Sequence, residues 1–264
     1  MLKVEITVNK DIVVYTSLFG DYDELTEISE PDLECEYICF TDQNNLKSKT
    51  WKIIIIKHNN ESAYMNRMYK MLPHRFLAEY KVSLYVDSNI ILKKNMSQII
   101  RHYTTLANIS IPRHFMRNCI YEEALFCLKT NKIDKIIYER LINQYYLLNK
   151  FPKGFGMGEN NIIIRKHHSP EIIEAMEKWW LFYVNIAKRD QLSLMFVLWL
   201  NNVNFMLMQE TSRNKNDYFD YKLHKHLISN SKFKTFLRSA SARRDRNLLF
   251  KLIGKIMDNC KGYK

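Results

Sequence analysis

Runs of β-branched and aromatic residues recur along the chain and predict a series of short strands. Such runs, bounded by polar or turn-forming residues, are typical of strands buried in a sheet. The expected strands lie at 11–20, 36–42, 51–56, 82–92, 105–112, 160–167 and 203–208. Helical spacing of apolar residues predicts helices at 61–80, 119–148, 169–187 and 190–200. Strands that alternate with helices indicate an α/β fold, with a mostly parallel central sheet flanked by helices.

The positive charge of the chain is concentrated near its C-terminal end. The formal net charge is +12, and residues 211–264 hold 14 Lys and Arg against 4 Asp and Glu. This asymmetry predicts two parts, an α/β domain over 1–210 and a basic helical tail over 211–264. Within the tail, residues 246–258 form an amphipathic pattern with Lys251 and Lys255 away from the leucines. Such a helix suits an anionic membrane surface, but it can equally pack its apolar side on the domain.

Several classes of protein are disfavoured by composition and motifs. The 5 cysteines include no CxxC pair, which indicates reduced thiols rather than a disulfide framework or a zinc site. No secretory signal is visible, and the longest apolar stretch is far below the roughly 20 residues of a membrane span. The nearly neutral body lacks a nucleic-acid motif, so we expect no nucleic-acid partner. These features predict a cytoplasmic protein whose tail can reach the inner face of a membrane.

Asp87 and Asn89 stand two residues apart inside an apolar run. An unpaired carboxylate in such surroundings is costly, so Asp87 needs a partner. Two oxygen ligands at this spacing can face one hard cation. A divalent ion there can bridge the phosphates of a nucleotide and stabilise a leaving diphosphate. An Asx turn at the end of a strand is an equally good interpretation of the same residues.

Arg67 and Lys70 share one face of the helix predicted over 61–80, just ahead of this acidic strand end. Arg can bind a diphosphate as a fork and Lys as a point charge. A solvated basic face would show the same spacing, and it is the commoner origin of such a pattern.

Polar loops follow two of the early strands, at the sheet edge where ligands bind in α/β proteins. In the first loop, Tyr22 can stack on a base, and Asp21 or Asp23 can bind a base or a ribose hydroxyl. An ordinary polar loop capped by Asp is the alternative. Thr41 and Asp42 end the second strand, and we expect them at the same edge.

Two late pairs of residues complete the candidates. Asp190 and Gln191 begin an apolar helix, where Asp190 can face sugar hydroxyls or simply cap the helix. His224 and His226 can complete a metal site, although two such histidines are more often surface residues.

The order of these motifs resembles one family. Its segments occur across roughly residues 12–200 as "VVYTSLFGDYDEL", "YICFTD", "RMYKMLPHRFLAEYKVSLYVDSNI", "CIYEEA", "GENNIIIRKH" and "RDQLSLMFVLW". The series is similar to the glycosyltransferase-like family that includes plant turgor-regulation and seed-mucilage proteins and bacterial polysaccharide-locus proteins. That family looks like the GT-A glycosyltransferases and is distantly similar to glycogenin-type enzymes.

The resemblance implies a UDP-sugar donor held over Mn²⁺ or Mg²⁺ at a DxD-like motif. The matching positions are Asp87 and Asn89, with His224 as a further metal ligand. Asp87, Asp190 and Gln191 are expected to be catalytic, the last two facing the transferred sugar. Further donor contacts are expected from Tyr15, Thr16, Asp21, Tyr22, Asp23, Thr41, Asp42, Arg67, Lys70 and Ser88.

The expected activity is sugar transfer from a nucleotide-diphosphate sugar to a glycan or lipid-linked glycan in surface polysaccharide synthesis. Two alternatives stay open. One is a metal-dependent lipid-amide hydrolase, because some relatives are linked to ceramide hydrolysis and His224 and His226 can contribute to a metal site. The other is a non-catalytic module that binds a glycan or a membrane.

Overall fold

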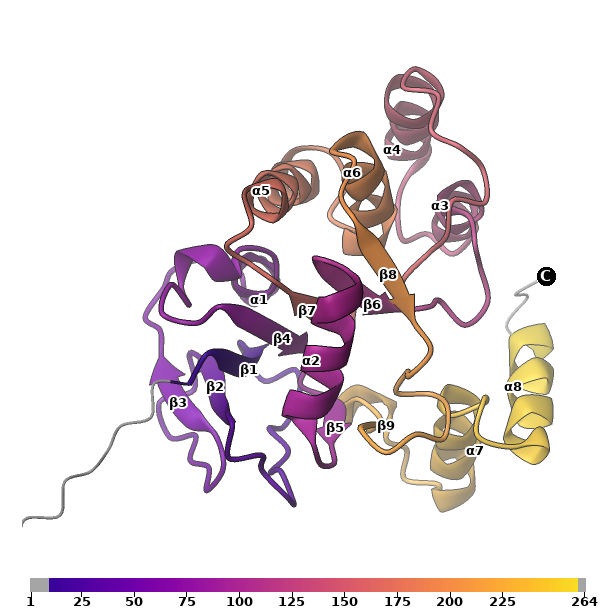
Figure 1. Cartoon of the computed structure of the whole chain (residues 1–264). Coiled ribbons are helices and arrows are strands. Elements are labelled where there is room, and N and C mark those ends of the chain that lie inside the picture. Colours follow the sequence, from indigo (N-terminus) through magenta and orange to yellow (C-terminus); the bar gives the residue numbers. More distant parts are fainter. Residues whose placement is uncertain (1–9, 261–264) are drawn as a thin grey trace, which may run out of the picture.

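The computed structural model describes residues 10–260, which fold around one mixed β-sheet (Figure 1). The strand order is β3-β2-β1-β4-β7-β6-β8. The strands are β1 (Ile12–Leu18), β2 (Cys35–Thr41), β3 (Lys52–Ile55), β4 (Val82–Val86), β6 (Ile109–Pro112), β7 (Ile162–Arg165) and β8 (Phe205–Met208). β1 to β4 are mutually parallel, β7 runs antiparallel to β4 and β6, and β8 is parallel to β6. The predicted α/β class and mostly parallel, GT-A-like sheet are confirmed.

Two hydrophobic cores cover the two faces of this sheet, because side chains alternate along each strand. Val13 and Tyr15 of β1 belong to one core, whereas Ile12 and Val14 belong to the other. The first core is covered by α1 (Ser62–Met71), α3 (Ile120–Lys129), α5 (Pro170–Asn185) and α6 (Leu194–Leu200). The second is covered by α2 (Met96–Leu106) and a small sheet of β5 (Ile90–Leu92) and β9 (Phe219–Tyr221).

The strand predicted over 82–92 is in fact two strands in different sheets. β4 ends at Val86, and a turn closed by a 2.9 Å hydrogen bond from the Ile90 amide to the Asp87 carbonyl leads into β5. β5 then pairs antiparallel with β9, far along the chain. Asp87 and Ser88 therefore occupy a turn at the carboxyl edge of the main sheet, where a ligand can reach them.

The helices also differ in detail from the predicted ones. α1 stops at Met71, because Pro73 begins a separate 3₁₀ turn, Pro73–Arg75. The segment 119–148 contains α3, α4 (Lys135–Arg140) and a π-helical turn, Leu141–Leu147. A 3₁₀ turn at Asp190–Leu192 precedes α6. The helix α2 was not predicted at all.

The chain after residue 210 does not separate from the sheet at that point. Phe219 and Tyr221 of β9 are buried in the second core. A 3₁₀ turn follows at Lys225–Leu227, and then come α7 (Lys232–Ala242) and α8 (Leu248–Cys260). Any division of the chain therefore falls nearer to α7 than to the predicted boundary. The tail residues 261–264 lie outside the described residues. Within residues 10–260, no helix combines the length and the apolar character that a membrane span requires.

Candidate functional site

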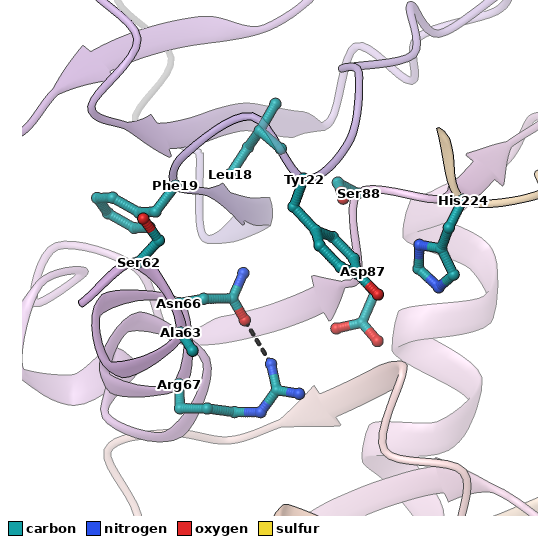
Figure 2. Close-up of a pocket in the computed structure, with 10 residues that line it drawn as sticks. All are labelled: Leu18, Phe19, Tyr22, Ser62, Ala63, Asn66, Arg67, Asp87, Ser88 and His224. Carbon is teal, nitrogen blue, oxygen red and sulfur yellow. Dashed lines mark hydrogen bonds between the residues drawn. The ribbon is translucent and has the colours of Figure 1, made fainter. Parts of the chain in front are cut away.

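A cavity of about 490 Å³ opens beyond the carboxyl ends of β1 and β4 (Figure 2). The sheet order changes direction between these two neighbouring strands, and open α/β sheets bind ligands at such a point. The residues that line the cavity are Leu18, Phe19, Tyr22, Ser62, Ala63, Asn66, Arg67, Asp87, Ser88 and His224. The predicted residues among them are Tyr22, Arg67, Asp87, Ser88 and His224. Residues distant in the sequence therefore converge where the sequence predicted a donor site.

Asp87 lies on the cavity wall between Tyr22, Arg67 and His224 (Figure 2). Its Oδ1 accepts a hydrogen bond from the Tyr85 hydroxyl at 2.8 Å and one from Lys70 Nζ at 3.4 Å. These two groups are the partners that a carboxylate in apolar surroundings requires. The side chain of Asp87 is 29% exposed, so it remains accessible from the cavity.

Lys70 is almost fully buried and joins two carboxylates. Its Nζ lies 2.8 Å from Asp190 Oδ2 and 3.4 Å from Asp87 Oδ1, with its side chain 2% exposed. Arg67 Nε lies 3.6 Å from the same Asp190 oxygen. Burial opposes ionisation of Asp190, but the Lys70 and Arg67 cations outweigh it and hold the pKa of this carboxyl well below its usual range. Two cations and two carboxylates thus form one network, in which Arg67 and Asp87 line the cavity and Lys70 and Asp190 lie behind it.

Asp190 and Gln191 stand in the 3₁₀ turn before α6, and neither lines the cavity. Asp190 instead acts behind Arg67. Burial lowers the pKa of the Arg67 guanidinium, but the nearby Asp190 and Asp87 carboxylates more than offset this and raise it. Asp190 therefore fixes the charge and position of Arg67, and a direct contact of Asp190 or Gln191 with sugar stays a prediction.

Asn66 is a lining residue that the sequence interpretation missed. Its Nδ2 donates to the Ser17 carbonyl at 2.7 Å, and its Oδ1 accepts from Arg67 Nη1 at 2.6 Å. Asn66 therefore ties the guanidinium to the end of β1. The available signal was the spacing of Ser62, Asn66 and Lys70, which repeats every four residues and places them on one helix face.

Arg165 was also missed, although it is fully buried beneath the site. Its Nη2 donates to the Tyr15 hydroxyl at 2.6 Å and to the Lys70 carbonyl at 2.8 Å. Burial raises the pKa of Tyr15 to about 12, against the opposing effect of Arg165. Tyr15 and Thr16 were expected to contact the donor, but both are buried in the sheet and neither lines the cavity. The signal for Arg165 was an arginine at the end of the apolar run "NNIIIR".

Thr41 and Asp42 support the loop after β1 and do not line the cavity, contrary to the prediction. The Gly20 amide donates to both Asp42 oxygens, at 2.9 and 3.1 Å. Gly20 has a φ of +69°, and an added Cβ would stand 2.7 Å from Ser62 Oγ. Thr41 is fully buried, and its hydroxyl accepts from the Gln43 amide. The Asp42 carboxylate and the glycine at position 20 therefore determine the course of the loop that follows β1, which we call the cavity loop.

Asp23 ties this loop to the segment after β9. Its carboxylate accepts from His224 Nδ1 at 2.6 Å, from the Lys225 amide at 3.1 Å and from Ser88 Oγ at 3.3 Å. Burial raises the pKa of Asp23, but these hydrogen bonds outweigh it and leave the pKa below its ordinary value. Asp23 is therefore a buried support for His224.

Asp21 and Tyr22 contact the same segment from the loop surface. Asp21 pairs with Lys225 Nζ at 2.8 Å, outside the cavity. The Tyr22 ring lies 5.2 Å from the His224 ring and 5.3 Å from the His226 ring. Residues from the two ends of the domain therefore build one wall of the site together.

The predicted metal ligands fit a divalent cation only in part. Asp87 and His224 line the cavity, whereas Asn89 is 3% exposed and its amide donates to the Lys222 carbonyl at 3.1 Å. Within residues 10–260, no three His, Cys, Asp or Glu side chains are grouped to hold an ion. Ions such as Mg²⁺ often use one or two protein ligands and take the others from phosphates and water. Asp87 and His224 fit a cation completed in that way, and the prediction for Asn89 is not supported.

Fold and cavity together define an α/β protein with a candidate ligand site at the switch point of its sheet. The chain matches the family model described as "TOD1/MUCI70, glycosyltransferase-like domain" over residues 3–224, and it belongs to that family. The match confirms the family expected from the motifs. It also extends beyond the predicted boundary at 210 and includes β9 and His224. A search of curated proteins found no match.

Proposed function

We propose that this protein is a glycosyltransferase that uses a nucleotide-diphosphate sugar, with UDP-sugars as the first candidates, and a glycan or lipid-linked glycan as acceptor. The main support is the convergence of Asp87, Arg67 and His224 on one cavity at the β1–β4 edge. A carboxylate, a guanidinium and an imidazole that face one space can bind a diphosphate and a cation together.

The nucleoside is expected beside Tyr22. This side chain is 57% exposed on the cavity loop, so its ring face is available to stack on a base. The Ser88 hydroxyl lines the same cavity and can accept a hydrogen bond from a ribose hydroxyl, because its own proton is donated to Asp23. The diphosphate would then extend past Asp87 toward Arg67.

The diphosphate is expected between Arg67 and Asp87. Arg67 presents a planar fork suited to phosphate oxygens, and Asn66 and Asp190 hold it in place. Asp87 and His224 would hold a Mn²⁺ or Mg²⁺ ion, which would neutralise charge on the leaving diphosphate. Lys70 and the Tyr85 hydroxyl keep the Asp87 carboxylate oriented toward the cavity. Fixed positive groups aimed at developing charge are a major source of catalysis.

The lipid-amide hydrolase has less support in this geometry. Zinc hydrolases commonly use two or three histidines around an open coordination position. His224 is the one histidine among the residues that line the cavity, and its Nδ1 is bound to Asp23. The transferase is therefore the function to test first.

The decisive experiment measures nucleoside diphosphate release from a panel of UDP-sugars with Mn²⁺ or Mg²⁺, with and without glycan acceptors. Asp87→Ala should lower turnover by at least about 10²–10³-fold, the scale of losing one transition-state contact. Asp11→Ala is the matched control, because Asp11 lies in an exposed ion pair with Lys81. The control should keep wild-type turnover.

Three results would contradict the proposal. Unchanged turnover in Asp87→Ala would remove this carboxylate from the reaction. The absence of both turnover and thermal stabilisation with every nucleotide sugar would favour a non-catalytic binding module. Stabilisation by zinc alone, with cleavage of a lipid amide, would favour the hydrolase.

A further inference from the structure

The helix α8 leaves its leucines uncovered. Leu248, Leu249, Leu252 and Ile256 are 85%, 60%, 56% and 53% exposed. Their spacing places them on one stripe of the helix. We call these four residues the α8 stripe. Gly254 on another side of α8 is buried against Arg244, so the helix packs through a different face.

Figure 1 shows α8 at the edge of the molecule, on the opposite side from β3. α8 contacts α7, and the Phe236 and Phe250 rings meet at 6.1 Å. Arg244 additionally binds Asp258 on α8, with Nη2 3.1 Å from Oδ1. The helix is therefore held by contacts that do not use its stripe, and a solvent-exposed apolar row of this kind is normally an interaction surface.

Exposed lysines lie on α8 beside this row and on the neighbouring helix α7. Lys251 and Lys255 are exposed on α8, and Lys232 and Lys234 are exposed on α7. In the described part of the chain, none of these four ammonium groups makes an ion pair with an acidic side chain. The acid on α8, Asp258, is neutralised by Arg244. Apolar side chains bordered by unpaired lysines match the chemistry of an anionic bilayer, with acyl chains below negative headgroups.

We propose that the α8 stripe and its flanking lysines dock the protein on the surface of an anionic lipid bilayer. The leucines would enter the boundary between headgroups and acyl chains, and the lysines would bind the headgroups. This inference stands independently of the proposed function, because it involves no residue of the cavity. A transferase anchored in this way would meet lipid-linked acceptors in two dimensions.

The test is co-sedimentation of the full chain with vesicles of phosphatidylcholine, alone or mixed with phosphatidylglycerol. The wild type should bind the mixed vesicles, bind pure phosphatidylcholine weakly, and dissociate as salt is raised. Lys251→Gln/Lys255→Gln should weaken binding on the order of tenfold. Leu248→Ser/Leu252→Ser should weaken it at least about tenfold, because both side chains lose apolar burial.

Matched controls come from loops remote in sequence. Leu33→Ser removes a leucine that is 86% exposed, and Lys47→Gln/Lys49→Gln removes two exposed lysines. Both controls should bind vesicles as the wild type does. Circular dichroism and thermal melting of every variant verify that folding is intact.

Three outcomes would overturn the proposal. The first is a wild type that does not sediment with anionic vesicles, and the second is a stripe variant that binds them as tightly as the wild type. The third is a wild-type dimer in analytical ultracentrifugation that Leu248→Ser/Leu252→Ser dissociates without any change in vesicle binding. That last result would assign the stripe to a second copy of this chain.

Discussion

The α/β body and the α7–α8 hairpin (residues 232–260) use their apolar residues in opposite ways. Leu194 and Leu198 of α6 are fully buried in the first core. Leu248 and Leu252 of α8 are more than half exposed. The body is therefore stabilised by apolar burial, whereas the hairpin must be attached by other means.

Arginines provide that attachment. Arg243 donates to the Tyr221 carbonyl at 2.7 Å and to Asp220 Oδ1 at 3.0 Å. Arg213 donates to the Ala242 carbonyl at 3.0 Å. Arg238 likewise donates to the Leu227 carbonyl at 2.6 Å, whereas Arg244 binds Ser241 within the hairpin. Among the described residues, the exposed lysines of the hairpin make no ion pair with an acidic side chain. The arginines of this region therefore attach the hairpin to the body through their hydrogen bonds. The exposed lysines are instead available to bind a partner.

Buried charge in the body gives the largest predicted effect. Lys70→Met leaves the buried Asp190 carboxylate without its closest cation, and breaking such a pair costs about 3–5 kcal/mol. Urea unfolding followed by circular dichroism measures the change in the free energy of unfolding. Lys81→Met is the control, because Lys81 and Asp11 form a pair with side chains 76% and 56% exposed, and its loss should cost less than about 1 kcal/mol. Equal losses of unfolding free energy in Lys70→Met and Lys81→Met would contradict the network assigned around Lys70.

Leucine truncation compares the two regions directly. Leu198→Ala opens a cavity in the first core and should lower the free energy of unfolding by about 2–5 kcal/mol. Leu252→Ala removes an exposed side chain and should change it by less than about 0.5 kcal/mol. Urea titrations of both variants measure these values. A large loss of unfolding free energy in Leu252→Ala would mean that the α8 stripe is covered in solution. It would contradict the assigned difference between the body and the hairpin.

The smallest predicted effect concerns pH and the contact between the cavity loop and the segment after β9. Because the pKa of Asp23 is lowered in the fold, its stabilising contribution is complete above the ordinary value of 3.8 and is lost as pH falls through the folded value. Asp23→Asn should therefore cost about 1 kcal/mol near neutral pH. That difference from the wild type should shrink as the pH falls below 3.8 and through the folded value. A difference that stays constant across this range would contradict the assigned ionised contact.

Much of the sheet was predictable because each of these strands corresponds to one continuous apolar run in the sequence. β1, β2 and β3 coincide with runs of β-branched and aromatic residues, so periodicity was enough. The break after Val86 was not predictable in this way, because it depends on the pairing of β5 with β9. The helix α2 should have been found, since Met96, Ile99, Ile100 and Tyr103 are buried at helical spacing. The lysines and arginines after residue 210 predicted the basic character of the hairpin, but they did not predict where it lies in the fold.

The candidate site was predictable in its residue types but not in its connections. Asp87, Arg67, Lys70 and Asp190 were singled out from spacing and motif order. Their arrangement, with Lys70 buried between two carboxylates, required the packing of α1 against the turn before α6. Tyr15 lies in one of the motifs but supports the site from the core, and sequence order does not distinguish support from contact.

The central claim is that the cavity between β1 and β4 binds a nucleoside diphosphate through Asp87. Isothermal titration calorimetry with UDP in the presence of Mn²⁺ tests it most directly, on the wild type, Asp87→Ala and the Asp11→Ala control. We predict saturable binding to the wild type and the control, and loss of measurable binding in Asp87→Ala. Binding of equal affinity in all three proteins, or no binding to the wild type, would contradict the claim.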